Sequence, residues 1–368
     1  GPSKGVCTNN LIINGSMQMY QRSTGSGYTG ASSYTLDRWK ITSGGLDESC
    51  TITRHDLSAS DATDDPAWAA GLRSSLHCQN GNQTSGAGAA DYIRLIQHIE
   101  GRIIRNAGWN HKSTSSYVTL SFWVKSSVAQ NFYGYVRTQS GTTQSYIFET
   151  GSLTANTWTK VTKTIPGGAN NDISENTSAG LSLYINPFHG TDYTGTTTLN
   201  QWAAFSGSVR APDNTSTWYT TNDATFELTG VQLEVGQVAN DFKPEPFDEL
   251  KLRCERYYEK SYSNANGPGT DTASGMVINR LGGSTAITNR TDMSVRFRVE
   301  KRAAPTMTIY AKNGGAGKCS DFETGVTHVA QRTVDAILTV SPTGNLGLDL
   351  NSGQDDALAY HYVADAEL

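Results

Sequence analysis

The chain has 368 residues, of which 36% are hydrophobic and 17% charged, and its formal net charge is −5. This length suffices for roughly two domains of ordinary size. The negative charge and the lack of a Lys/Arg cluster exclude the basic field that nonspecific nucleic-acid binding needs, so we expect no nucleic-acid partner. No run of about 18 apolar residues and no signal-peptide pattern occurs, so we also expect no membrane insertion and no secretory export.

The first part of the chain has the pattern of a strand-rich domain. The 37 glycines and the abundant Ser, Thr and Asn favour strands and turns over helices. Gly1-Pro2-Ser3 resembles a remnant of protease cleavage on a recombinant protein, so residues 1–10 are predicted to be this remnant and a linker, and we expect the natural chain to be longer. Alternating or short apolar runs predict at least eight strands, which suit a sandwich, at residues 11–20, 49–55, 92–99, 117–125, 132–138, 157–165, 180–186 and 225–234.

A boundary is predicted at Pro244 and Pro246, because two prolines remove backbone donors and interrupt a ladder of strands. The first domain therefore spans residues 11–246. The pattern of residues 247–258 predicts the best helix in the chain, with Asp248 as its cap and with Leu250 and Cys254 on one face. Residues 247–260 are thus predicted to be a short helical connector.

The C-terminal part, residues 261–368, is predicted to be a second and smaller β-sandwich domain. Its expected strands are separated by Gly, Asn and Asp turns and lie at residues 275–279, 293–300, 306–311, 334–340 and 359–364. The whole chain is therefore predicted to be all-β, with the helical connector between its two domains.

The cysteines indicate neither a disulfide framework nor a zinc site. They are odd in number, widely spaced and without a Cys-x-x-Cys pair: Cys7, Cys50, Cys78, Cys254 and Cys319. We expect reduced thiols, as in a protein made and assembled in a reducing cytoplasm.

No catalytic motif is present, so the chain is predicted not to be an enzyme, and no catalytic residue or cofactor is proposed. The seven histidines are scattered, and no Gly-x-Ser-x-Gly elbow occurs. Acidic pairs such as Asp64-Asp65 are expected in solvated turns, because adjacent strand residues face opposite sides and would not form a glycosidase pair.

The tryptophans are candidate sugar-stacking residues, since sugar rings pack their C–H faces on aromatic rings. Trp39, Trp123 and Trp158 lie in strand-like alternation and are expected in the core. Four others lie in polar or glycine-rich loop contexts, where either an exposed stacking platform or ordinary packing explains them: Trp68, Trp109, Trp202 and Trp218.

The strand predicted near residues 92–100 has two unlike faces. One face carries Tyr92, Arg94, His98 and Glu100, and the other carries Ile93, Leu95, Gln97 and Ile99. The polar face is either a ligand-binding surface, with Tyr92, Arg94 and His98 as its candidates, or an ordinary solvent-facing strand surface.

Several motifs, taken in order, resemble tail-fibre and virion structural proteins of tailed bacteriophages of the marine or cyanobacterial type, which have a jelly roll like that of galactose-binding and carbohydrate-binding modules. The motifs are Asn10-Leu-Ile-Ile-Asn-Gly-Ser-Met-Gln-Met-Tyr-Gln-Arg, Leu36-Asp-Arg-Trp, Gln97-His-Ile-Glu-Gly, Val118-Thr-Leu-Ser-Phe-Trp-Val-Lys-Ser, Asn156-Thr-Trp-Thr-Lys, Leu228-Thr-Gly-Val-Gln-Leu-Glu-Val-Gly, Phe242-Lys-Pro-Glu-Pro, Cys254-Glu-Arg-Tyr-Tyr, Ala303-Ala-Pro-Thr and Tyr360-His-Tyr-Val-Ala-Asp-Ala-Glu-Leu. Together they span nearly the whole chain.

The resemblance implies a sandwich that binds glycans on a concave face or in loops at one end. It also implies a virion location in the tail or fibre, other tail proteins as partners and a homotrimer. Similar modules hold a structural calcium, for which the matching positions are near Asn14 and Thr229. Thr229-Gly230 lacks the paired acidic residues that many relatives supply, so we do not assign this ion.

Three functions follow as hypotheses. The first is an adhesin that binds a host surface polysaccharide or other glycan without catalysis. The second is a purely structural virion component. The third is a polysaccharide depolymerase, which needs two carboxylates about 5–10 Å apart in a groove.

Overall fold

The computed structural model describes residues 10–22, 32–280, 294–321, 331–350 and 357–368. The chain forms two compact units, one of Gly1–Gln18 with Thr24–Glu245 and one of Met19–Ser23 with Pro246–Leu368. Residues 19–23 thus group with the second unit, although the predicted domain scheme gave them to the first. The predicted remnant at Gly1-Pro2-Ser3 lies outside the described residues.

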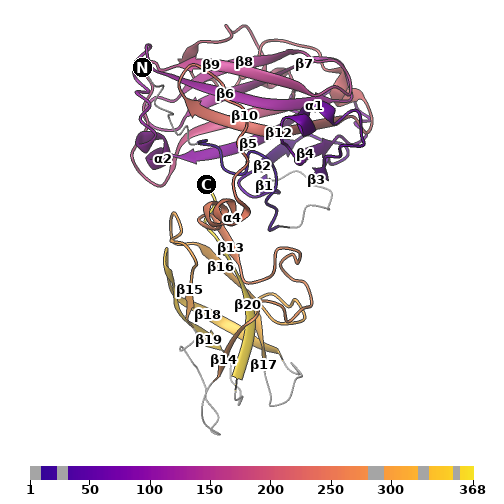
Figure 1. The fold of residues 1–368 in the computed structure, drawn as a ribbon. Helices are drawn as coiled ribbons and strands as arrows, with labels where there is room; N and C mark the ends of the chain where they lie inside the picture. Colours follow the sequence, from indigo (N-terminus) through magenta and orange to yellow (C-terminus); the bar gives the residue numbers. More distant parts are fainter. Residues whose placement is uncertain (1–9, 23–31, 281–293, 322–330, 351–356) are drawn as a thin grey trace. The chain divides into compact units, whose positions relative to one another are not determined.

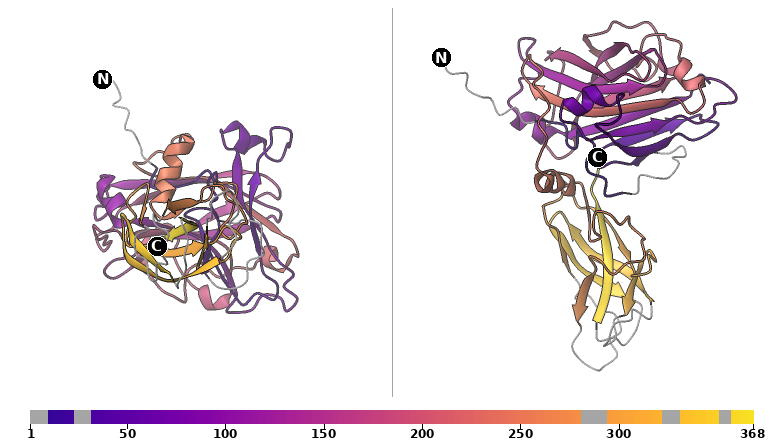
Figure 2. Two further views of the ribbon diagram at one scale, coloured as in Figure 1. Left: turned by 90° about the horizontal axis from the view of Figure 1, so that it is seen from below. Right: turned by 45° about the vertical axis from the view of Figure 1, so that its right-hand side comes forward.

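The larger unit is a β-sandwich of the jelly-roll class, with two facing antiparallel sheets (Figures 1 and 2). The seven-stranded sheet has the order β1 (Ser32–Tyr34), β2 (Lys40–Gly44), β5 (Tyr92–Glu100), β10 (Ala179–His189), β7 (Asn131–Thr138), β8 (Gln144–Ser152) and β11 (Trp202–Ala204). The five-stranded sheet has the order β3 (Thr51–Asp56), β4 (Ser74–Gln79), β12 (Thr225–Val235), β6 (Tyr117–Ser126) and β9 (Thr159–Pro166).

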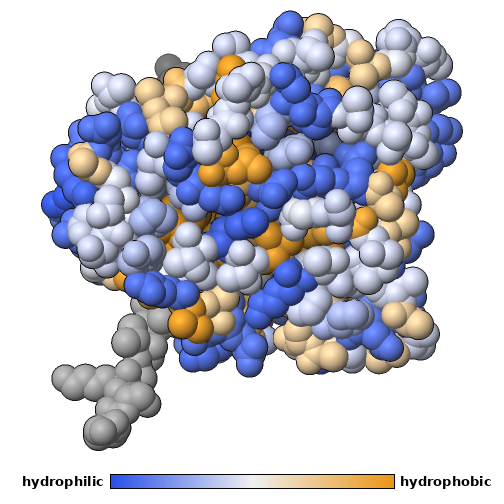
Figure 3. Space-filling model, turned by 90° about the horizontal axis from the view of Figure 1, so that it is seen from above, coloured by the Kyte–Doolittle hydropathy of each residue, from blue (hydrophilic) through white to orange (hydrophobic). Residues whose placement is uncertain are grey.

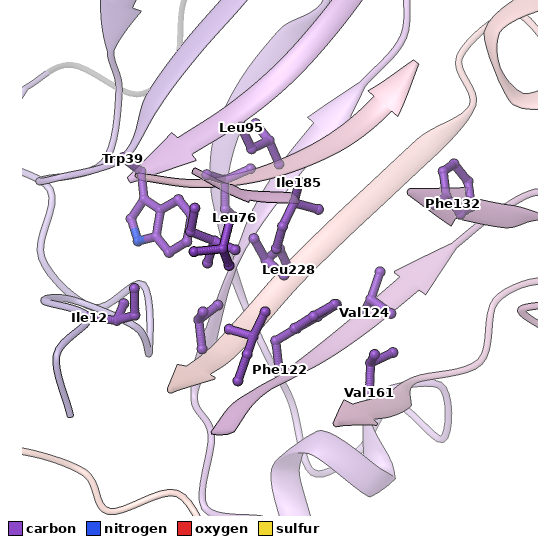
Figure 4. Close-up of a cluster of buried hydrophobic side chains, with 14 of the residues drawn as sticks. Ile12, Trp39, Leu76, Leu95, Phe122, Val124, Phe132, Val161, Ile185 and Leu228 are labelled. Atoms are coloured by element: carbon purple, nitrogen blue, oxygen red, sulfur yellow. The ribbon is translucent and has the colours of Figure 1, made fainter. Parts of the chain in front are cut away.

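The main hydrophobic core lies between these two sheets. Along β6, Val118, Leu120, Phe122 and Val124 all point into it, as the two-residue period of a strand dictates. Figure 4 shows side chains of both sheets gathered there, together with Ile12 from the N-terminal segment. Complete burial of one such side chain contributes roughly 1.5–3 kcal/mol, so this core provides the rigid support for both outer faces.

Short helices lie in the connections between strands of the larger unit: α1 (Asp65–Ala69), α2 (Gly101–Asn106), the 3-10 turn η1 (Thr191–Tyr193) and α3 (Thr217–Thr220). Two connections cover the outer faces of the sheets. Residues 57–73, with α1, pack on the outer face of the five-stranded sheet through Trp68 and Ala67. Residues 190–216 include the edge strand β11, and Leu199 and Phe205 on either side of β11 pack on the outer face of the seven-stranded sheet.

The smaller unit is an antiparallel β domain organised by its last strand (Figure 1). Its strands are β13 (Tyr258–Lys260), β14 (Val277–Arg280), β15 (Val295–Arg296), β16 (Thr306–Tyr310), β17 (Lys318–Asp321), β18 (Gln331–Ser341), β19 (Gly344–Leu350) and β20 (Ala357–Asp365). β20 pairs with β13, β14, β16 and β17. Residues 19–22 belong to this unit, because Lys260 Nζ donates to the carbonyl of Gln21 (2.8 Å) and the Arg22 guanidinium lies 3.5 Å from the Tyr258 ring centre.

The all-β prediction is confirmed, with two local corrections. Residues 11–20 were predicted as a strand but form bends and turns, because Asn14 and Met17 adopt positive φ angles of 58° and 59°. The predicted helix is α4 (Phe247–Glu255), and it buries Leu250 and Cys254 as expected. Its N-cap is Pro246, and Asp248 lies in the first turn instead.

None of the helices in the described part of the chain combines the length and the apolar character that crossing a bilayer requires. On the side of the molecule seen in Figure 3, small hydrophobic patches alternate with hydrophilic residues. Cys50 and Cys78 are reduced and lie buried next to each other in the larger unit, and a contact between their side chains, together with burial, raises the pKa of Cys78.

Candidate binding site

The outer face of the seven-stranded sheet carries the polar face predicted for residues 92–100. Ile93, Leu95 and Ile99 enter the main core, whereas Ile96 joins a separate cluster on the opposite side of the sheet. Because side chains alternate along a strand, Tyr92, Arg94 and His98 lie on that same outer face. Glu100, also predicted there, is fully buried where β5 ends and α2 begins.

Aromatic rings form the floor of this face. Tyr135 of β7 and Tyr184 of β10 stack with their centres 4.2 Å apart, and His98 meets Tyr184 edge-on at 6.5 Å. Ile147 of β8 and Phe205 of the 190–216 connection complete the cluster. This apolar floor holds the connection against the sheet.

The 190–216 connection brings Tyr193 and Arg210 to the β5 side chains. The Tyr193 ring meets the Tyr92 ring edge-on at 5.4 Å. The guanidinium of Arg94 lies 3.8 Å from the Tyr92 ring centre and 4.7 Å from that of Tyr193, and the guanidinium of Arg210 lies 4.8 Å from Tyr193. Such cation–π contacts fix the planes of both guanidinium groups.

Arg94 and His189 form the polar centre of the face. Arg94 Nε donates to His189 Nε2 over 2.8 Å, which leaves the proton of the imidazole on Nδ1. Burial, followed by the charges of Arg94 and Arg210, lowers the pKa of His189 well below its ordinary value, so the ring is neutral. His189 thus presents an N–H donor from Nδ1.

Several buried polar atoms on this face have no hydrogen-bond partner among the described residues. They are both side-chain amide atoms of Asn186, Nδ1 of His189 and Nη2 of Arg94, on residues only 4%, 7% and 9% exposed. Native proteins pair nearly all buried polar groups, because an unmet one costs about 1–3 kcal/mol. This concentration therefore indicates a place where a polar ligand or water completes the bonds.

A small pocket adjoins Asn186 and His189, and its lining also includes Tyr133 and Ser216. It encloses about 10 Å³, which is room for one water molecule or one hydroxyl group. A sugar ring does not fit inside, but a ring lying outside on the face can place one hydroxyl in it.

Two of the predicted tryptophan platforms are wrong. Trp109 is 4% exposed and Trp218 is 0% exposed, and both belong to the main core. Trp218 Nε1 donates to the carbonyl of Thr225 at 2.9 Å, and its ring packs against Phe132 and Phe226. A polar loop context did not reveal that these rings turn inward, so neither has a face for stacking.

The other two tryptophans are half-buried and lie apart from the polar centre. Trp68 of α1 packs over the five-stranded sheet, with the Arg73 guanidinium 3.7 Å from its ring centre. Trp202 of β11 donates from Nε1 to the carbonyl of Pro166 at 2.6 Å and meets Tyr146 edge-on. The four tryptophans therefore form no common platform. Of the residues predicted to be in the core, Trp39 and Trp158 are buried and Trp123 is half-buried.

The outer face of the five-stranded sheet holds a second polar cluster, and its charges are matched. Lys125 Nζ lies 3.2 Å from Asp64 Oδ1 and 3.0 Å from Glu227 Oε1. Glu227 Oε2 accepts a hydrogen bond from Ser75 at 2.6 Å and contacts His55 at 2.8 Å. Although burial opposes it, these bonds and the ammonium of Lys125 lower the pKa of Glu227 to about 2, so this carboxylate is no general acid at neutral pH.

The positions matched to a structural calcium are used in other ways. Asn14 Nδ2 donates to the carbonyl of Asp37 at 3.0 Å, and Thr229 Oγ1 donates to the carbonyl of Ser74 at 2.6 Å. In the part of the chain that is described, no group of three His, Cys, Asp or Glu side chains is arranged to hold a metal ion.

No protein-family model and no curated protein matches the chain. Among solved structures, it is similar to the enzymatically active domain of tailspike protein 4 of bacteriophage CBA120, with 11% identity and a TM-score of 0.33, over 62% of this chain and 21% of that one. It is also similar to a putative sugar binding protein from Bacteroides thetaiotaomicron, with 14% identity and a TM-score of 0.31, over 62% of this chain and 100% of that one.

A third similar structure is the family 11 carbohydrate-binding module from Clostridium thermocellum in complex with a mixed-linked tetrasaccharide. Its identity is 9% and its TM-score 0.27, over 59% of this chain and 99% of that one. Similarities this low establish neither family nor ligand for this chain. The case for a function therefore rests on its own residues.

Proposed function

We propose that the chain is a non-catalytic, glycan-binding protein of a tailed-phage virion, a tail-fibre or related adhesin, and that it binds glycan on the outer face of the seven-stranded sheet. The observation that carries the proposal is the set of unpartnered polar atoms on Asn186, His189 and Arg94. They lie beside Tyr92 and Tyr193, which are only half-buried.

This combination matches what a sugar offers. The apolar face of a sugar ring packs on an aromatic side chain, while its hydroxyl groups both donate and accept hydrogen bonds. The amide of Asn186 provides a donor nitrogen and an acceptor oxygen, and His189 Nδ1 provides a donor. A ring stacked near Tyr193 would place one hydroxyl into the small pocket lined by Asn186 and His189.

The virion assignment is supported by the ordered motifs that resemble tail-fibre proteins. In that setting the partners are a host surface polysaccharide and other tail proteins, and the particle is assembled in the host cytoplasm. A homotrimer would repeat the site three times. Repetition raises avidity through effective concentration, so a weak single site is sufficient to hold a particle on a cell.

The proposal includes no hydrolysis. The polar side chains that this face offers to a ligand are those of Arg94, Asn186, His189 and Arg210, and none of them is a carboxylate. The buried carboxylates Asp64 and Glu227 on the other sheet share one ammonium group, which keeps both in use as structural ion-pair partners.

A glycan array with the full chain and its Tyr193→Ala variant tests the proposal. Wild type should bind a restricted set of glycans, and Tyr193→Ala should lose most of the signal because the stacking ring is gone. Tyr117→Ala, which removes a half-buried tyrosine of the other sheet, is the matched control and should bind normally. Absence of binding by folded wild type would favour the purely structural virion role, and release of shortened sugar products would favour a depolymerase.

A further inference from the structure

Three arginines gather on the outer face of the seven-stranded sheet. The guanidinium groups of Arg94 and Arg210 lie 4.7 and 4.8 Å from the centre of the Tyr193 ring. Arg137 lies 3.7 Å and Arg210 5.7 Å from the centre of the Phe205 ring. The rings of Tyr193 and Phe205, both in residues 190–216, thus contact Arg94 of β5, Arg137 of β7 and Arg210.

These arginines have no acidic partner in the part of the chain that the structure describes. Over the described residues, none of the three forms an ion pair, whereas Lys125 has two carboxylates and Arg298 has Glu255. Burial, followed by the charge of Arg210, lowers the pKa of Arg94, as expected when like charges meet in a partly dry site. The chain as a whole carries a net charge of −5, so this positive cluster is a local feature.

The unpartnered atoms around the arginines are mostly donors. They include Arg94 Nη2, the Nε atoms of Arg137 and Arg210, and the N–H at Nδ1 of His189. Four donors without acceptors are complementary to a group that only accepts hydrogen bonds and carries negative charge. Arginine forms charge-assisted, often bidentate bonds with such oxyanions.

We propose that this face selects acidic glycans, whose sugars carry a carboxylate or a sulfate group that the arginine cluster binds. The inference rests on the proposed glycan-binding function and adds the class of sugar. The aromatic rings hold the guanidinium planes in place before the ligand arrives, so little side-chain freedom is lost on binding. Salt should weaken the interaction, because mobile ions screen the charges.

The test is a binding titration of the full chain with polygalacturonate as the carboxylated probe and carrageenan as the sulfated probe. Dextran and laminarin serve as neutral glycans, and duplex DNA serves as a polyanion without acidic sugars. At low salt at least one acidic polymer should bind about tenfold or more tightly than the neutral ones. A preference for one of the two acidic probes would identify the anionic group.

Arg210→Gln is the main variant, because this half-buried arginine lies in a connection and its loss should leave the fold intact. We expect roughly tenfold weaker binding of the acidic polymer, as for the loss of one charge-assisted contact. Arg137→Gln provides a second, independent removal of charge. Arg73→Gln is the matched control, since it removes an arginine that also stacks on an aromatic ring, Trp68, but on the other face.

The outcomes separate the two proposals. Equal or tighter binding of neutral glycans, unaffected by Arg210→Gln, would overturn the acidic class and leave glycan binding intact. Failure of every glycan to bind the folded protein would overturn both. Binding of DNA as tight as that of the acidic glycans would reduce the cluster to a general polyanion surface and would also overturn the inference.

Discussion

The two outer faces of the β-sandwich differ in whether their charged side chains form ion pairs. On the five-stranded sheet, Lys125 lies between Asp64 and Glu227, and Glu227 is further bonded by Ser75 and His55. On the seven-stranded sheet, Arg94, Arg137 and Arg210 form no ion pair with any described residue, and they lie near buried polar atoms of Asn186 and His189 that have no hydrogen-bond partner there.

The difference teaches how to distinguish a structural polar cluster from a binding one. A buried ion pair that is fully bonded fixes the segments it joins, here the α1 connection to the sheet. A cluster of one charge type with unmet donors costs folding free energy and is retained where a ligand completes it. The first face should therefore control stability, and the second should control binding.

The largest effect is expected from Lys125→Met. Removing the ammonium leaves two buried carboxylates, of which only Glu227 keeps a partner that can carry positive charge, His55, so the free energy of unfolding should fall by about 3–5 kcal/mol. Arg210→Gln on the other face should change it by no more than about 0.5 kcal/mol. Chemical denaturation of both variants measures this contrast, and equal losses in the two would show that the comparison is wrong.

The next effect is acid sensitivity of the five-stranded face. The pKa of Glu227 is lowered from 4.5 to about 2 in the folded protein. A carboxylate whose pKa is lower in the folded than in the unfolded protein stabilises the fold fully above its pKa in the unfolded protein. This stabilisation is lost as pH falls from about 4.5 toward 2, and it amounts to roughly 3 kcal/mol at most. Unfolding free energies between pH 5 and pH 2 should fall more steeply for wild type than for Glu227→Gln, and parallel curves would contradict this assignment.

A smaller effect of opposite sign is expected at Asn186. Because both amide atoms are buried without partners among the described residues, Asn186→Leu should raise the free energy of unfolding by about 1 kcal/mol. The same change should abolish glycan binding. Thermal melting measures the gain in stability, and the glycan array measures the loss of binding. A destabilised variant would mean that the Asn186 amide forms hydrogen bonds in the free protein.

The smallest effect concerns His55. Its hydrogen bond to Glu227 raises the pKa of the imidazole, so the bond stabilises the fold below the ordinary pKa of histidine and weakens as pH rises through the raised value. The side chain is 39% exposed, so solvent screening limits the effect to about 0.5 kcal/mol. Melting temperatures at pH 6 and pH 8 should differ slightly less for His55→Gln than for wild type, and an equal or larger difference would argue against this role.

The sequence predicted those strands whose apolar residues alternate within a short stretch of the chain. Alternation along residues 92–99 and 117–125 identified β5 and β6 and the polar face of β5, because each strand packs one side on a core. It failed for residues 11–20. Their apolar side chains are buried, but Gly15 and the positive φ angle at Asn14 fit the segment against Val231 as a bent chain.

The candidate site was only partly predictable, because its residues meet through tertiary structure. The register shift between Ile185 and Phe188 in β10 sets the placement of Asn186 and His189, and alternation alone does not reveal it. Tyr193 and Arg210 arrive on the long 190–216 connection. A connection of that length that carries aromatic side chains, such as Tyr193 and Phe205, was the available signal, since long ordered loops are often functional.

The most direct test of the account is hydrogen–deuterium exchange of the full chain with and without an acidic polymer. The polymer is whichever of polygalacturonate and carrageenan binds more tightly. The account predicts slower amide exchange at residues 190–216 and at the ends of β5 and β10 near Tyr92 and His189. It predicts no change at residues 57–73 on the opposite face. Protection at residues 57–73, or only in the smaller unit, with none at residues 190–216, would contradict the assignment of the outer face of the seven-stranded sheet as the binding site.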